Sequence, residues 1–214
     1  MAKNSWILNE RQQTIDNWLR AAANFYGIVT PRVFLILFNR YNKPKLLKAE
    51  LMKYWHKFDV KSWKYYALYD NAIVRRGVMP EKIAEIQYRQ QGKKYYMPTD
   101  KELLNYIDPD YYEKTPESER VYQYLRITLK LNHEDADKFM KIVTWMMRVD
   151  DPIPKVMNVL DNFQLVLQDI DQAKEFLLLI SDLSNHTRKW SNCGFTPDEL
   201  FTGWEVTREM FSRN

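Results

Sequence analysis

The sequence predicts a mainly α-helical protein with two modules: a helical N-terminal module with a winged helix-turn-helix hairpin, and a C-terminal helical bundle. Apolar residues recur with the helical period of about 3.6 along most of the chain. Helix-capping residues followed by proline open several segments. Residues 1–98 contain 18 Lys and Arg against 7 Asp and Glu, whereas residues 99–214 contain 14 against 21. We therefore place the modules at 1–97 and 98–214.

Three helices are expected in the first part of the chain. The first ends at Gly27 and carries an apolar stripe with helical spacing: Ile15, Trp18, Leu19, Ala22 and Tyr26. The second begins at Thr30-Pro31, where a hydroxyl can cap the helix and proline presets φ, and it runs to Tyr41. A short turn at 42–45 precedes the third helix, whose expected buried stripe is Leu47, Leu51, Trp55 and Phe58.

A β-hairpin is expected near 65–76. Residues 65–69 and 72–76 are rich in aromatic and β-branched side chains, and Asp70-Asn71 between them tolerates the left-handed conformations of a tight turn. The same run could also continue a helix. A further helix opens at Pro80 and stops at Gly92, and residues 93–98 look extended.

The C-terminal module reads as a series of capped helices. Thr99 begins a short helix through Leu104, Thr115-Pro116 begins the next, and Asn132 caps a third. Two more are expected near 155–167 and 171–192. Thr196 and Glu199 form a capping box for a closing helix.

Helix, turn, helix and hairpin, in that order from Thr30 to Gly77, is the arrangement of a winged helix-turn-helix module. Its cations would contact phosphates, which would make binding sensitive to salt. The predicted nucleic-acid-binding residues are Lys45, Lys48, Lys53, Lys57, Lys61, Lys64, Arg75 and Arg76. Interleaved aromatic residues such as Tyr65 and Tyr66 could equally stack single-stranded bases. In the alternative interpretation two adjacent helices simply pack together and their lysines are solvated.

No catalytic, cofactor or metal motif emerges. The five glycines stand apart, so there is no phosphate-binding loop, and one cysteine with three scattered histidines does not make a zinc site. The acidic pairs lie at expected helix borders, where capping explains them. Cys193 and His186, seven residues apart, are the only pair that would support an enzyme. We therefore expect a protein that is not an enzyme and holds no cofactor or metal.

The segment from Asn185 to Phe201 is the most distinctive stretch of the chain. Three polar residues, Asn185, Arg188 and Asn192, are spaced to share one helical ridge. Together with Trp190 they are the predicted partner-binding residues. Capping and a chain reversal at Gly194 would explain much of the same segment without a partner.

This segment resembles the N-x-T-R-x-W-x-N-x-G-x-T-P-x-E-L signature of uncharacterised helical proteins of bacteria, mainly Firmicutes, many of which carry a C-terminal SEC-C metal-binding tail. The run Tyr95–Thr99 and the run Tyr111–Pro116 look like the same group. The cysteine-rich tail is missing here, so the resemblance implies no metal site in this chain.

The single cysteine, Cys193, cannot form an internal disulfide, and the longest apolar runs are too short to span a bilayer. These features favour the cytoplasm and no membrane partner. The expected function is a non-enzymatic regulatory or adaptor protein whose basic module contacts DNA or RNA and whose acidic module contacts protein. The alternative is a purely protein-binding or self-associating helical adaptor, in which the basic half docks an acidic partner.

Overall fold

The computed structural model describes residues 9–57, 65–69, 71–150 and 153–202. Its contacts divide the chain into unit 1, residues 1–88 and 97–109, and unit 2, residues 89–96 and 110–214. The chain therefore crosses between the units three times. Unit 1 contains 16 Lys and Arg and 10 Asp and Glu, and unit 2 contains 16 and 18. The difference in charge between the parts keeps its predicted sign but is smaller than the difference between the two halves of the sequence.

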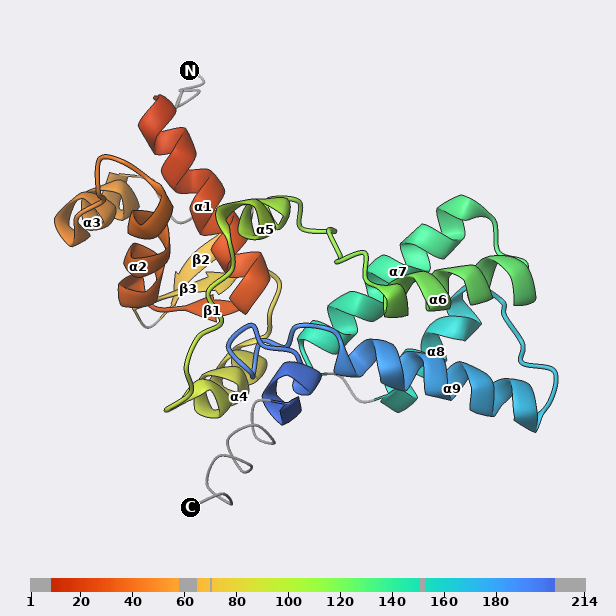
Figure 1. The fold of residues 1–214 in the computed structure, drawn as a ribbon. Helices are drawn as coiled ribbons and strands as arrows, with labels where there is room; N and C mark the ends of the chain where they lie inside the picture. The colour runs from red at the N-terminus through yellow and green to blue at the C-terminus, as the bar shows by residue number, and fades with distance from the viewer. Residues whose placement is uncertain (1–8, 58–64, 70, 151–152, 203–214) are drawn as a thin grey trace. The chain divides into compact units, whose positions relative to one another are not determined.

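Unit 1 combines helices with a small sheet, and Figure 1 shows its elements in red to green. In chain order they are α1 (Glu10–Tyr26), β1 (Ile28–Val29), α2 (Pro31–Tyr41), α3 (Lys48–Lys57), β2 (Tyr66–Tyr69), β3 (Ala72–Arg75), α4 (Pro80–Gln90) and α5 (Asp100–Asn105). The last two residues of α4 belong to unit 2. The predicted mainly helical character is confirmed for the described residues.

The three strands form an antiparallel sheet in the order β1-β3-β2. β2 and β3 form the predicted hairpin, with Tyr66 opposite Arg75 and Tyr69 opposite Ala72. Asn71, directly before β3, has φ of 57°, a left-handed conformation that asparagine tolerates better than most residues. β1 pairs with β3, with Ile28 opposite Val74. The sequence analysis did not predict β1, because two residues are too few to form a periodic pattern.

The core of unit 1 lies between α1, α2, α3 and the sheet. The apolar stripe predicted for α1 is buried, and Asn24 on the same helix donates to the Tyr106 carbonyl just after α5 at 2.7 Å. The stripe predicted for α3 is buried at Leu51 and Trp55, and Phe58 lies outside the described residues. The prediction was wrong for Leu47, which is 68% exposed, whereas the preceding Leu46 is buried. The turn before α3 determines which of the two leucines is buried, because a shift of one residue along the chain turns a side chain from the core toward solvent.

The described elements of unit 2 are all helical: α6 (Pro116–Gln123), η2 (Tyr124–Thr128), α7 (His133–Arg148), α8 (Ile153–Asn162) and α9 (Ile170–Asn185). Side chains from all five elements build one core, including Leu125, Phe139, Val156 and Phe176. η2 is a π-helical continuation of α6. The wider π turn changes the register, and Thr128 at its end is exposed.

The predicted helix at 171–192 is shorter in the structure. α9 ends at Asn185, and His186 caps it with a backbone bond to the Asp182 carbonyl. Residues 187–196 form a compact turn in which the Trp190 amide donates to the Arg148 carbonyl at 3.0 Å. The Thr196–Glu199 capping box forms as predicted, with N···O distances of 3.0 and 3.1 Å, and opens a closing helical segment.

Candidate nucleic-acid interface

Side chains of the neighbouring helices hydrogen-bond to the turn between α2 and α3. Thr30 caps α2 by accepting from the Val33 amide, as predicted. Asn39 bonds reciprocally with Leu46: its amide group donates to the Leu46 carbonyl at 2.9 Å, and its oxygen accepts from the Leu46 amide at 2.6 Å. The Asn39 side chain thus satisfies both the backbone N–H and the backbone C=O of Leu46, which lie in a turn without regular backbone hydrogen bonds.

Arg11 of α1 reaches the same turn from the other side. It donates to the Pro44 and Lys45 carbonyls at 3.0 and 3.3 Å. It also forms a bidentate ion pair with Glu50 of α3, with N···O distances of 2.6 and 3.0 Å. This pairing lowers the pKa of the Glu50 carboxyl and raises that of the guanidinium. Three helices are therefore joined at the point where α3 begins.

A buried carboxylate joins α1, α3 and the hairpin. Asp16 accepts on Oδ1 from the Tyr54 hydroxyl of α3 at 3.1 Å and from the Tyr66 hydroxyl of β2 at 2.9 Å. Arg20, one turn along α1, places Nη2 2.6 Å from Oδ2, an ion pair whose groups are not aligned as a hydrogen bond. Burial, above all, raises the pKa of both tyrosines above its ordinary value. The cluster fixes the position of the hairpin relative to α3.

The predicted cations fall into three groups. Lys45, Lys48 and Lys53 have exposed side chains on or just before α3. Lys57 is the last residue of α3, and Lys61 and Lys64 lie outside the described residues. Arg75 ends β3 and donates to the carbonyl of Arg76. Arg76 itself is an exposed residue. The structure thus brings together only part of the predicted set.

Lys48 and Lys53 do not share one ridge of α3. They are five positions apart, which is about 140° around a helix. Between them the outward surface carries exposed Ala49 and half-buried Met52. The two lysines consequently flank the outward face of α3 on either side.

An open groove of about 720 Å³ lies on the Lys48 side, and we call it the α2 groove. Its lining residues are Thr30, Pro31, Arg32, Leu35, Ile36, Lys48, Asn71, Ala72 and Gln87. Ile36 is 50% exposed, and the two charged residues, Arg32 and Lys48, are both exposed cations. The sequence analysis missed Arg32, although its place directly after Thr30-Pro31 puts it in the first turn of α2.

The predicted partner-binding residues are mostly engaged inside unit 2. Arg188 donates to Glu113 at 2.9 Å, to the Gly194 carbonyl at 3.0 Å and to both oxygens of Glu199 at 3.1 and 3.2 Å. Its guanidinium also stacks on the Tyr96 ring, 3.9 Å from the centroid. Despite burial, the two carboxylates raise the pKa of Arg188 above its usual value. Arg188 therefore joins three segments that are distant in sequence.

The other three members of that set have different surroundings. Trp190 is fully buried and meets Trp145 edge to face at 5.0 Å. Asn192 accepts from Lys93 at 3.2 Å, and Asn185 is exposed at the end of α9. Because α9 ends at Asn185, the helical ridge expected to carry Asn185, Arg188 and Asn192 is not formed.

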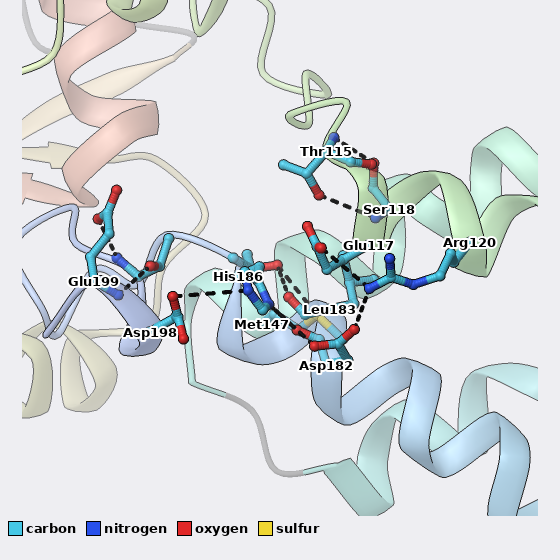
Figure 2. Close-up of polar contacts among 12 residues, drawn as sticks. Thr115, Glu117, Ser118, Arg120, Met147, Asp182, Leu183, His186, Asp198 and Glu199 are labelled. Carbon is cyan, nitrogen blue, oxygen red and sulfur yellow. Dashed lines mark hydrogen bonds and ion pairs between the residues drawn. The ribbon is translucent and has the colours of Figure 1, made fainter. Parts of the chain in front are cut away.

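Glu117, Asp182 and His186 form a group of metal-ligand type among the described residues, with ligand atoms within 4.8 Å of one another. Figure 2 shows that Arg120 points into this group. Its guanidinium lies 2.5 Å from Asp182 and 3.2 Å from Glu117. The two carboxylates already have a cation, so the arrangement is an ion-pair network between α6 and α9.

His186 extends this network toward the closing helical segment. Its Nδ1 lies 2.9 Å from the Asp182 carbonyl and its Nε2 lies 4.0 Å from the Asp198 carboxylate. The carbonyl bond raises the pKa of the imidazole, and Glu117, Asp182 and Asp198 add to the effect. A raised folded-state pKa favours the protonated ring, so the stabilisation is present below about pH 6.5 and is lost as pH rises through the folded-state pKa.

We expect His186→Gln to lower the stability of unit 2 at about pH 5.5 and to change it little at about pH 8. The effect stays below about 1 kcal/mol, because the ring is partly solvated. Urea denaturation of both proteins at the two pH values measures the difference. An equal difference at both pH values would contradict this assignment.

Cys193 is fully buried and lies in a left-handed turn with φ of 53°. Its sulfur lies 3.8 Å from the Gln90 carbonyl, and burial raises the pKa of the thiol to about 11. A protonated, buried thiol is a poor nucleophile at neutral pH. The pairing with His186 as base, which would have supported an enzyme, has no geometric support, since the ring of His186 bonds with Asp182 instead.

No protein-family model, curated protein or solved structure matches this chain. The resemblance to Firmicutes-type helical proteins therefore stays a prediction. None of the described helices is both long enough and apolar enough to cross a membrane.

Proposed function

We propose that this protein is a non-enzymatic regulatory or adaptor protein whose unit 1 contacts nucleic acid as a winged helix-turn-helix module. The observation that carries the proposal is the element order α1-β1-α2-α3-β2-β3 with sheet order β1-β3-β2. In such a module the second helix of the pair enters the major groove and the hairpin lies beside it. Here that helix is α3, and the hairpin is β2–β3.

The side chains on α3 support this assignment. The major groove is about 12 Å wide and is bordered by a phosphate backbone on each side. Lys48 and Lys53 flank the outward face of α3, so each would meet a different border. Ala49 and Met52 between them are apolar and suited to contact with thymine methyl groups. Lys45, just before the helix, adds a third exposed cation.

Unit 2 is the proposed protein-contact module. Large apolar side chains stand exposed on it: Ile127 at 63%, Val166 at 81%, Ile170 at 67% and Leu178 at 72%. Exposed side chains of this size are available for contact with a protein partner. In the alternative function, a protein-binding adaptor that does not contact nucleic acid, the basic half docks an acidic partner.

We expect affinity for a labelled mixed-sequence DNA duplex to fall steeply with salt. If five or more phosphates are engaged, log Kd against log salt concentration changes with a slope of magnitude about 4 or more. Fluorescence anisotropy between about 50 and 200 mM NaCl measures the slope. Absence of binding at low salt would reject the nucleic-acid proposal and leave the adaptor alternative.

The double variant Lys48→Ala/Lys53→Ala tests the interface itself. Removing two phosphate contacts is expected to reduce the magnitude of the salt slope by about 2 and to weaken binding on every sequence. The control Lys94→Ala/Lys101→Ala removes the same charge from exposed lysines that do not belong to α3. Equal losses for both variants would mean that only net charge matters, which would contradict a defined interface.

A further inference from the structure

The α2 groove combines an apolar floor with positive edges. Pro31, Leu35, Ile36 and Ala72 supply the floor, and Arg32 and Lys48 supply the charge, with no acid among the lining residues. A phosphate backbone would use the two cations but leave the floor in water. A purely apolar ligand would cover the floor and leave the cations without counter-charge. The surface fits an occupant with both carboxylates and an aliphatic side chain.

Unit 2 presents a surface of that chemistry on α9. Asp171, Glu175, Leu178 and Asp182 follow one another at helical spacing along its exposed side, and we call them the α9 ridge. The Leu178 side chain is 72% exposed, and the side chains of Asp171 and Asp182 are 86% and 41% exposed. Lys174 pairs with Asp171 at 3.1 Å, and Arg120 of α6 pairs with Asp182 at 2.5 Å. The three acids and these two cations leave the ridge with a net charge of −1, and Glu175 is the acid that the proposal uses.

We propose that the α2 groove binds the α9 ridge of a second copy of this chain. Leu178 would enter the apolar floor against Leu35 and Ile36. Glu175, one turn before Leu178, would pair with Lys48 at the edge of the groove. A helix laid in an apolar groove with charges at its edges is a common mode of peptide recognition. The charge complementarity on the two surfaces selects this occupant over an unrelated one.

Self-association of this kind would oppose nucleic-acid binding, because Lys48 belongs to both surfaces. The inference does not depend on nucleic acid, however, since both surfaces are present in the chain alone. Its test therefore contains no DNA, and it can fail while the proposed function stands.

The first measurement is the mass of the full chain in solution, by multi-angle light scattering, over a range of protein and salt concentrations. We expect association at low salt that weakens as salt rises, because exposed charge pairs are screened. Leu178→Glu and Ile36→Glu should each reduce association at least about tenfold. Circular dichroism should show that both variants are folded, because each replaced side chain is largely exposed.

A charge exchange between two copies gives the decisive test. Lys48→Glu and Glu175→Lys should each weaken self-association about tenfold, since each creates a like-charge pair. An equimolar mixture of the two variants should recover association, because each groove then meets a ridge of opposite charge. Lys101→Glu, an exposed lysine on α5, is the matched control and should associate like the wild type.

A chain that stays monomeric at all concentrations would overturn the inference. Association that ignores Lys48→Glu and Glu175→Lys, or a mixture that fails to recover, would overturn it as well. If Lys48→Glu weakens DNA binding in a chain that is always monomeric, the groove serves nucleic acid alone.

Discussion

Replacing Asp16 by alanine is expected to destabilise unit 1 by about 3–5 kcal/mol. The change removes the acceptor of two buried tyrosine hydroxyls, on Tyr54 and Tyr66, and the counter-charge of Arg20. Typical domains are stable by only about 5–15 kcal/mol. A loss of this size should therefore expose the amides of α1, α3 and β2 to hydrogen exchange well before those of unit 2. Hydrogen exchange followed by mass spectrometry locates the effect.

Asp16→Asn separates the two contributions. Both tyrosines donate to the same oxygen, Oδ1, and the asparagine carbonyl can keep both bonds while the ion pair with Arg20 is lost. We expect a smaller loss of about 1–2 kcal/mol. Gln13→Ala, an exposed position on the same helix, is the control and should cost less than about 0.5 kcal/mol. If Asp16→Ala costs no more than Gln13→Ala, the buried cluster does not hold α3 and the hairpin.

Disrupting the same cluster should also weaken the proposed nucleic-acid interface. Tyr54 belongs to α3 and Tyr66 to β2, so the cluster positions both elements that we propose to meet DNA. Asp16→Asn at a temperature where unit 1 remains folded should reduce affinity without changing the salt slope, because no phosphate contact is removed.

Arg188→Ala is expected to cost unit 2 about 3–5 kcal/mol in unfolding free energy. The change leaves the carboxylates of Glu113 and Glu199 and the Gly194 carbonyl without their shared donor, and it uncovers the Tyr96 ring. Arg188→Lys should recover only part of the loss, because an ammonium group cannot make a planar fork and stacks poorly. Urea denaturation followed by circular dichroism measures both variants.

Arg120 offers a matched control in the same unit. It also pairs with two carboxylates, Glu117 and Asp182, but its side chain is 51% exposed against 10% for Arg188. We expect Arg120→Ala to cost no more than about 1 kcal/mol, since water replaces most of the lost interaction. If Arg120→Ala and Arg188→Ala lowered the free energy of unfolding equally, burial of Arg188 would not be the reason for its larger expected contribution.

The local elements of the fold were predictable where a chemical signal sits in the chain itself. Thr30-Pro31, Thr99, Thr115 and Thr196 all cap the helices that they were expected to begin. The hairpin was predictable from two aromatic and β-branched runs around Asp70-Asn71. β1, the π turn of η2 and the end of α9 were not, because each depends on partners elsewhere in the chain.

The candidate interface shows the same division. The sequence identified Lys45, Lys48 and Lys53 by their charge, yet it could not tell that Lys48 and Lys53 lie on opposite edges of α3 or that Arg32 joins the same groove as Lys48. No local signal marked Asp16, because its role depends on hydroxyls 38 and 50 residues away. Arg188 was noticed as unusual, but its partners are 75 residues before it and 11 after it.

The sequence by itself determined the helical class, most helix starts, the hairpin and the uneven charge, because capping, periodicity and composition act over a few residues. The tertiary structure decided which side chains are buried, which charges are paired and which cations border one groove. Those properties come from segments distant in the chain, and their energies depend on how much water packing removes. The basic face of α3 is therefore a property of the sequence, whereas the groove beside it belongs to the fold.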